Sequence, residues 1–204
     1  PIGEVNDALR SLVDAELLFA STSGSADTYA FKHALVRDTA YQSLLNTQRR
    51  EIHGVIATAL QRAAGAGEVP LELVAHHLTE SAQNRAAIKQ WIAAGQQAVR
   101  RGAHLESRNH FGKALDLIEN EAPGEERDLL ELKALTNLGP VINMVKGAGS
   151  SDDLFNVGEI YERATQLCQQ SRGSPELVPS LMGRWAFYIQ TCRFDDALSG
   201  SALG

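Results

Sequence analysis

The chain has 204 residues, of which 44% are hydrophobic and 22% are charged, and its mean hydropathy of −0.19 is typical of a folded soluble protein, which excludes a disordered chain. Its 25 acidic residues outnumber its 19 basic residues, so a net charge of −6 disfavours direct binding to nucleic acid. No apolar run approaches the roughly 20 residues that span a bilayer, and no basic-then-apolar leader opens the sequence, so we expect a cytoplasmic protein that makes no membrane contact.

The first elements predicted along the chain are a short helix and a β-hairpin. Apolar residues recur at helical spacing from Val5 as far as the region of Asp14. A cluster of turn-forming residues, 21–27, then separates the apolar segments Leu18–Phe19 and Tyr29–Phe31. Two short apolar segments around such a cluster are typical of a β-hairpin.

Two amphipathic helices are predicted next. Apolar residues share one side from Phe31 to Leu45, and they continue through Leu60 after a polar break at Asn46–Thr47, which supplies a candidate N-cap. Glycines at positions 65 and 67 have the character of helix-ending residues. Helix, hairpin and helix in this order form the tail of a winged-helix domain, so we expect a partial winged helix over residues 1–66.

From Pro70, a residue typical of helix starts, the pattern predicts helical hairpins to the end of the chain. Residues 86–118 match the repeat of roughly 34 residues called the tetratricopeptide repeat, with Gly102 at its turn. In such a repeat, small residues let the two helices approach closely, and an aromatic residue fills the groove between successive hairpins. The matching positions are Trp91, Ala94, Gly95, Ala98, Ser107, Phe111 and Ala114.

Two further repeats follow, so residues 67–204 are assigned to tetratricopeptide-like repeats of which the last is incomplete. The second has a lengthened loop from Lys146 to Asp152, and the third begins at Leu181. Their matching positions are Leu135, Leu138, Gly139, Ile142, Val157, Tyr161 and Ala164, then Trp185, Tyr188, Phe194 and Ala197. Aromatic residues at repeat spacing are expected to form core rather than a ligand cage. The expected fold class is all-α with a small β-hairpin.

Two stretches carry a resemblance to a known family. Residues Tyr29–Leu45 (YAFKHALVRDTAYQSLL) and Arg49–His53 (RREIH) resemble the winged-helix end of the large bacterial signal-transduction ATPases with numerous domains. Many of those proteins carry an adenylate or guanylate cyclase domain at their N-terminus. In that family the winged helix is followed by a segment similar to Glu72–Glu80 and then by tetratricopeptide-like repeats. The same order here covers nearly the whole chain and implies a bacterial signalling protein.

Residues that would perform chemistry in such a protein are missing from this sequence. There is no Gly-x-x-x-x-Gly-Lys-Ser/Thr phosphate loop, no recognisable pair of cyclase metal carboxylates and no Gly-x-Ser-x-Gly motif. We therefore expect no catalytic residue, no metal and no cofactor in this chain. ATP is expected to bind elsewhere in the parent protein. The chain begins at Pro1 without a methionine and stops at Gly204 within an incomplete hairpin, which also suggests a segment of a longer protein.

The histidines do not have the spacing of metal ligands. His76 and His77 are adjacent and point about 100° apart on a helix, so they cannot ligate one ion as an i, i+4 pair does. Apart from His33, which is considered below, the remaining histidines are expected to lack acidic or cysteine neighbours at ligand spacing. These are His53, His104 and His110. Packing or solvation is the expected role of all five.

Cysteines and basic residues also favour structural roles. Cys168 and Cys192 form no Cys-x-x-Cys motif, and we expect buried or half-buried thiols. A basic patch beside the winged helix could be formed by Arg37, Arg49 and Arg50. The net negative charge of the chain instead favours a solvated helix face.

His33 is the one candidate functional residue. In the wider ATPase class, a winged-helix His in a motif like Met-His-Asp faces the bound diphosphate, and Phe31–Leu35 resembles that motif with Ala34 in place of the acidic residue. An imidazole can donate a hydrogen bond to a phosphate oxygen and lose it when domains rotate. The alternative is a His that caps or packs at the start of the following helix. A role in nucleotide sensing predicts that His33 is at least partly exposed in this chain.

The function expected from these observations is protein–protein interaction and interdomain coupling within a multidomain signalling ATPase or adenylate cyclase. The expected partners are other domains of the same polypeptide and a protein that binds the helical repeats. The alternative is the equivalent segment of an ATPase-type transcriptional regulator whose DNA-binding module lies outside this chain.

Overall fold

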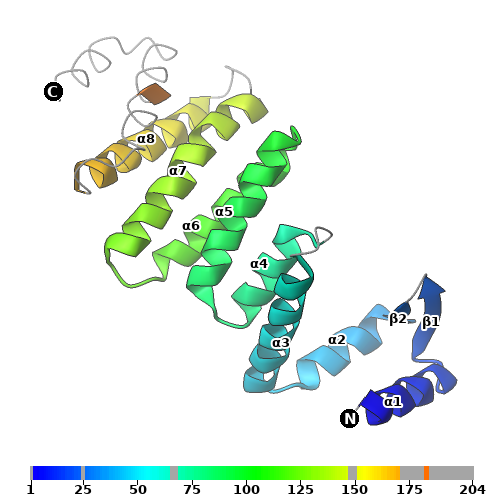
Figure 1. Ribbon diagram of the computed structural model, residues 1–204. Helices are drawn as coiled ribbons and strands as arrows, with labels where there is room; N and C mark the ends of the chain where they lie inside the picture. Colours follow the sequence, from blue (N-terminus) through cyan, green and yellow to red (C-terminus); the bar gives the residue numbers. More distant parts are fainter. Residues whose placement is uncertain (1, 24–25, 65–68, 147–150, 171–181, 184–204) are drawn as a thin grey trace. The chain divides into compact units, whose positions relative to one another are not determined.

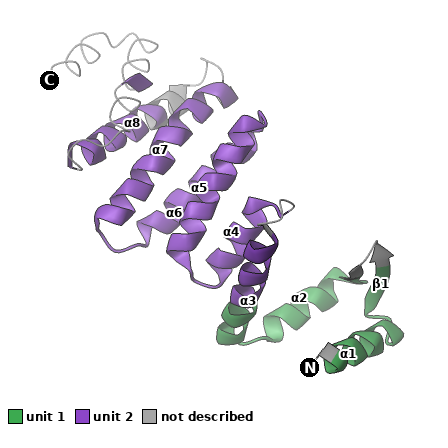
Figure 2. Ribbon diagram, viewed as in Figure 1, with its two compact units in different colours: residues 1–52 green, residues 53–204 purple. Residues whose placement is uncertain are grey.

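A computed structural model describes residues 2–23, 26–64, 69–146, 151–170 and 182–183. These residues form a mostly helical protein with one small antiparallel sheet, which confirms the predicted fold class (Figure 1). The chain divides into two compact units, residues 1–52 and 53–204 (Figure 2). This division falls within a helix, earlier than the domain boundary expected at residue 66, and Ala57 in the later part of that helix is buried in the core of unit 2.

Unit 1 contains the predicted helix and hairpin. Helix α1 spans Ile2–Asp14, and strands β1 (Leu18–Ser23) and β2 (Ala26–Phe31) pair in antiparallel register from Leu18 opposite Phe31 to Ser23 opposite Ala26. Helix α2 spans Ala34–Ser43, and α3 (Asn46–Ala64) begins in unit 1 and continues into unit 2. Gln48 caps the start of α3, because its side-chain Oε1 accepts a hydrogen bond from the backbone amide of Leu45 at 3.1 Å.

Unit 2 is a succession of helices, and after the first of them each helix packs closely against the next (Figure 1). Its elements are the second part of α3, then α4 (Leu71–Glu80), α5 (Asn84–Arg100), α6 (His104–Glu119), α7 (Glu125–Lys146) and α8 (Ser151–Gln170). Pro70 is the N-cap residue of α4, and Gly102 adopts a φ of +74° in the turn between α5 and α6, both as the sequence predicts.

Two glycines allow an aromatic ring to lie against a helix backbone. A Cβ placed on Gly95 of α5 would lie 2.6 Å from Cε1 of Phe111 on α6, and one placed on Gly139 of α7 would lie 2.6 Å from Cζ of Tyr161 on α8. Real Cβ atoms do not approach other atoms so closely, so each contact requires glycine. The close helix approach predicted for these hairpins is confirmed.

The predicted core positions of the first two hairpins are buried. All the matching residues of the hairpin α5–α6 and of the hairpin α7–α8 belong to the interior of unit 2. Trp91, Phe111 and Tyr161 are therefore core residues, as expected, and so is Cys168. Trp185, Tyr188, Cys192 and most of the third repeat lie outside the described residues, as do residues 147–150 of the long loop. No helix of the described part of the chain is both long and apolar enough to cross a bilayer.

Candidate functional site

The surface of unit 1 is unusually apolar. Among the side chains described in residues 3–21 and 28–52, the buried apolar residue is Leu18, which is 5% exposed. The large apolar side chains exposed on this unit, called here the unit 1 apolar surface, are Val5, Leu12, Phe19, Phe31, Leu35, Tyr41, Leu45 and Ile52. Leu35 is 81% exposed and Leu45 is 67% exposed. The described part of unit 1 thus has many large apolar side chains on its surface and few in its interior.

Helix α2 contributes most clearly to this surface. None of its residues is buried, although the sequence places apolar side chains along one side of it. An amphipathic helix normally lays its apolar stripe against a core. Val36 is partly buried, but Leu35 and Tyr41 are exposed, so most of the stripe is available to another surface.

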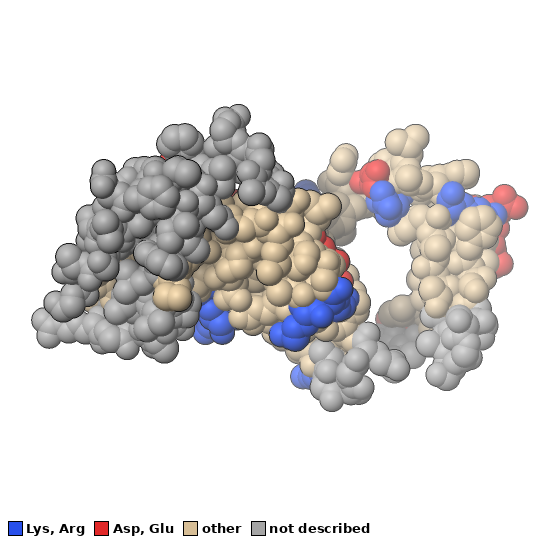
Figure 3. All heavy atoms as spheres, turned by 90° about the horizontal axis from the view of Figure 1, so that it is seen from above, with Lys and Arg blue, Asp and Glu red and all other residues tan. Residues whose placement is uncertain are grey.

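Three basic side chains of unit 1 that lie against neighbouring groups of the same unit are Lys32, Arg37 and Arg49. The Lys32 Nζ lies 5.1 Å from the centre of the Phe19 ring, and the Arg49 guanidinium lies 5.2 Å from the centre of the Tyr41 ring. Arg37 pairs with Asp38, its neighbour in sequence, at 2.8 Å. On the face drawn in Figure 3, which includes both units, Lys and Arg form small separate patches, some of them beside Asp and Glu, rather than a continuous stripe.

His33, the predicted nucleotide-sensing residue, occupies the N-cap position of α2. Its backbone is extended (φ −129°, ψ 126°), its carbonyl accepts hydrogen bonds from the amides of Val36 and Arg37, and its side chain makes no capping hydrogen bond. The imidazole is exposed. The exposure that the sensing role requires is present, and the role itself stays a prediction.

Unit 2 contains a groove between α6 and α8, with α7 beneath it. Its cavity has a volume of about 730 Å³. Apolar side chains of α7 form the floor, among them Leu135, Leu138 and Ile142. Charged side chains of both signs stand on α6 and α8 around it. These are Arg108, Lys113, Asp116, Glu119, Glu159 and Arg163.

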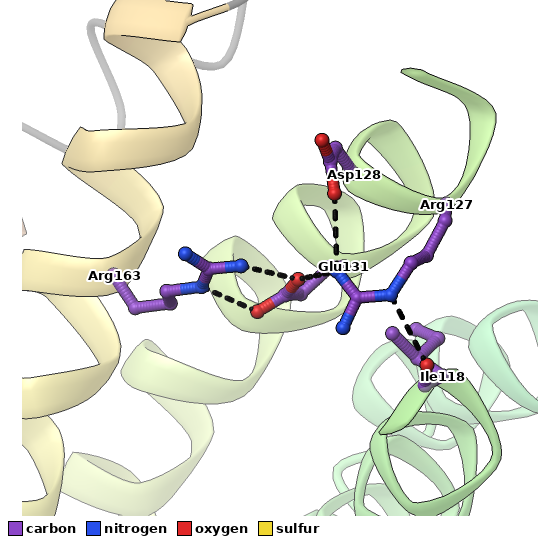
Figure 4. A network of polar contacts seen from close by, with 5 residues as sticks. All are labelled: Ile118, Arg127, Asp128, Glu131 and Arg163. Atoms are coloured by element: carbon purple, nitrogen blue, oxygen red, sulfur yellow. Dashed lines mark hydrogen bonds and ion pairs between the residues drawn. The ribbon is translucent and has the colours of Figure 1, made fainter. Parts of the chain in front are cut away.

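One end of this groove is organised by a nearly buried carboxylate (Figure 4). Glu131 of α7 accepts two hydrogen bonds from Arg163 of α8, at 2.7 and 2.9 Å, and one from Arg127 at 2.9 Å. Arg127 also donates to Asp128 and to the carbonyl of Ile118 at the end of α6. Hydrogen bonding to Glu131 raises the pKa of Arg163. Because the network joins α6, α7 and α8, it fixes the walls of the groove relative to its floor.

Three histidines meet where α3 packs on α4. The Nδ1 atoms of His53 and His77 are 2.8 Å apart, and the His76 ring centre lies 5.3 Å from that of His77. His53 is 7% exposed, His77 is partly buried and His76 is exposed. Elsewhere in unit 2, His110 is buried and stacks on Trp91 with ring centres 5.3 Å apart. Its Nε2 lies 3.4 Å from Oε1 of Glu106, one helical turn earlier, so the expectation that His110 has no acidic neighbour at ligand spacing is wrong. No group of three or more His, Cys, Asp or Glu residues in the described ranges is arranged to hold a metal ion.

Sequence reasoning missed the histidine cluster and the network around Glu131, because each joins residues far apart in the sequence. His53 and His77 lie 24 residues apart, and Glu131 and Arg163 lie 32 apart, so neither pair has a local spacing signal. A possible signal for the second pair was a Glu within an otherwise apolar helix face, where a carboxylate requires a partner.

Comparison with known proteins gives one informative similarity. A protein of Rhizobium meliloti (strain 1021), described as "Uncharacterized protein R02095", is 29% identical over 143 residues, which are 70% of this chain and 14% of that protein. The chain therefore spans a small part of the relative it matches. No known protein family and no solved structure match the chain.

Proposed function

We propose that this chain is a non-catalytic interaction and coupling segment of a multidomain signalling ATPase or adenylate cyclase. In this proposal, unit 1 is the end of a winged helix that docks on other domains of the same polypeptide. Unit 2 is a set of tetratricopeptide-like hairpins that binds a protein partner. Nucleotide chemistry belongs to other domains of the parent.

The observation that carries the proposal is the unit 1 apolar surface. Ordering a chain costs conformational entropy that burial of apolar area must offset, and unit 1 buries Leu18 alone among its described large apolar side chains. Covering a Leu side chain completely contributes about 1.5–3 kcal/mol. Leu35 and Leu45 are exposed enough to make most of that contribution on docking. A contact of this kind would make the order of unit 1 depend on a neighbouring domain.

The groove of unit 2 supports the second part of the proposal. Stacked helical hairpins present extended surfaces to protein partners. An apolar floor with a charged rim has the anatomy of a protein–protein interface, in which the centre excludes water and the edge provides polar contacts. The rim carries both signs of charge, so it favours a partner with a mixed polar face over a polyanion.

Two sequence observations agree with a segment in a longer protein. The order of the resembling stretches, Tyr29–Leu45, Glu72–Glu80 and then the hairpins, is that of the signalling ATPases. The relative that matches 70% of this chain is a much longer protein, because the match covers 14% of it.

The proposal is tested with matched surface substitutions in the full-length protein. Leu45→Gln and Leu35→Gln alter the unit 1 apolar surface, and Leu105→Gln on α6 is the control because Leu105 is also 67% exposed. The expected result is that the first two variants change the nucleotide turnover of the full-length protein severalfold, while Leu105→Gln does not. If all three variants have the turnover of the unsubstituted full-length protein, unit 1 does not couple to the catalytic domains.

A further inference from the structure

The contact between His53 and His77 restricts how many protons the two rings can hold. Two nitrogen atoms 2.8 Å apart are at hydrogen-bond distance, so one Nδ1 must donate a proton and the other must accept it with a lone pair. Two neutral rings satisfy this requirement when they are different tautomers. One imidazole and one imidazolium satisfy it as well, with a stronger, charge-assisted bond.

A second added proton is incompatible with the contact. Both Nδ1 atoms would then carry hydrogens that point at each other, and two positive charges would face each other in a partly buried place. His53 is 7% exposed and its ring faces His77 of α4, so its imidazole cannot turn fully into solvent while α3 keeps its place. The doubly protonated pair must therefore separate.

Helix α3 is the element that such a separation would release. The described part of α3 in unit 2 approaches its neighbours less closely than α4, α5, α6, α7 and α8 approach one another. Its apolar contribution to the core is modest, consisting mainly of Ala57 with Leu60 beside it. The chain passes from unit 1 to unit 2 between Ile52 and His53, so His53 is the first residue of unit 2.

We infer that His53 and His77 form an acid-sensitive latch, which holds α3 on α4 while the two rings share a hydrogen bond and releases α3 when both rings are protonated. The latch consists of contacts within unit 2 and stands whether or not the chain couples domains as proposed above. It gives the helix in which the two units join a response to pH.

The charged groups around the pair also favour release of α3 at low pH. His77 faces His53 of α3, and its neighbours on α4 are His76 and Glu80. Burial lowers the pKa of His77, His53 and His76 lower it further, and Glu80 acts in the opposite direction. A histidine whose pKa is lower in the folded state binds fewer protons when folded. Its contribution to stability is thus complete above the unfolded pKa of about 6.5 and is lost as the pH falls through the folded value.

Hydrogen exchange followed by mass spectrometry tests the latch on the chain with EDTA present, so that metal binding by imidazoles makes no contribution. Protection factors of α3 amides in residues 54–64 are compared with those of α6 at pH 7.5 and pH 5.5. We expect the protection of α3 to fall severalfold at the lower pH while that of α6 stays unchanged. His77→Asn places an amide near the position of Nδ1 and does not titrate, so it should remove this pH dependence. His76→Asn, on the exposed neighbour, should retain it.

Loss of α3 protection that is equal in the wild type and in His77→Asn would overturn the inference. If His77→Asn does not fold, NMR titration of the ring nitrogens in the wild type gives the answer. The latch requires that the pair take up its two protons in separate steps, the second at lower pH. Two independent titrations at the ordinary histidine pKa would contradict it.

Discussion

Replacing Gly95 by Ala tests the closest packing between α5 and α6. Gly95 lies inside α5, and a Cβ there would lie 2.6, 2.8 and 2.9 Å from three carbons of the Phe111 ring. Phe111 is fully buried, so its ring cannot move aside into solvent. Overpacking of this kind costs about 1–3 kcal/mol. Replacing Gly by Ala inside a helix raises the free energy of unfolding by up to about 1 kcal/mol, because Ala has the higher helix propensity.

The matched control is Gly112→Ala. Gly112 lies inside α6, and an added Cβ there meets nothing within 4 Å. We expect this variant to gain about 0.5–1 kcal/mol from helix propensity alone. The two alanine variants should therefore differ in free energy of unfolding by about 1–3 kcal/mol, with Gly95→Ala the less stable.

Urea denaturation followed by circular dichroism measures this difference directly. In thermal unfolding, it corresponds to about 2–4 °C per kcal/mol for a chain of this length. Phe111→Leu added to Gly95→Ala should recover part of the loss, because the smaller side chain leaves room for the methyl group. If Gly95→Ala stabilises the protein as much as Gly112→Ala does, the Phe111 ring does not pack on Gly95.

Four further outcomes are expected. Phe111→Ala should cost about 3–5 kcal/mol of unfolding free energy, and an unchanged melting temperature would contradict its place in the core. Glu131→Gln should cost about 2 kcal/mol in urea denaturation, since it weakens charge-assisted bonds from Arg127 and Arg163, whereas Gln169→Ala, at an exposed site on α8, should cost little. The purified chain should neither hydrolyse ATP nor make cyclic nucleotides, and turnover that copurifies with it and disappears on mutation of one of its residues would refute this. His33→Ala should leave the stability of the chain unchanged and alter the nucleotide affinity of the full-length protein, and an unaltered affinity would exclude the sensing role.

The hairpins of unit 2 were predictable because their determinants are local. Gly95 and Phe111 belong to adjacent helices of one hairpin, and Gly102 marks the turn between those helices. Small and aromatic residues at fixed offsets are therefore enough to indicate how the two helices pack. The β-hairpin was predictable for the same reason, since its strands flank one cluster of turn-forming residues.

The candidate surfaces were not predictable in the same way. The apolar stripe that includes Leu35 and Leu45 is visible in the sequence, but the sequence does not say whether the rest of unit 1 covers it. His53 gave no signal because its partner comes from another helix, and the spacing of His76 and His77 alone gave no reason to include it. Tertiary packing, rather than periodicity, determines both features.

The central claim is that another part of a longer protein covers the unit 1 apolar surface. Hydroxyl-radical footprinting of the side chains, carried out on this chain and on the full-length protein, measures that coverage directly. We expect Leu35 and Leu45 to react severalfold less in the full-length protein, while Leu105 on α6 reacts equally in both. Leu35 and Leu45 that react as strongly in the full-length protein as in the chain alone would contradict the claim.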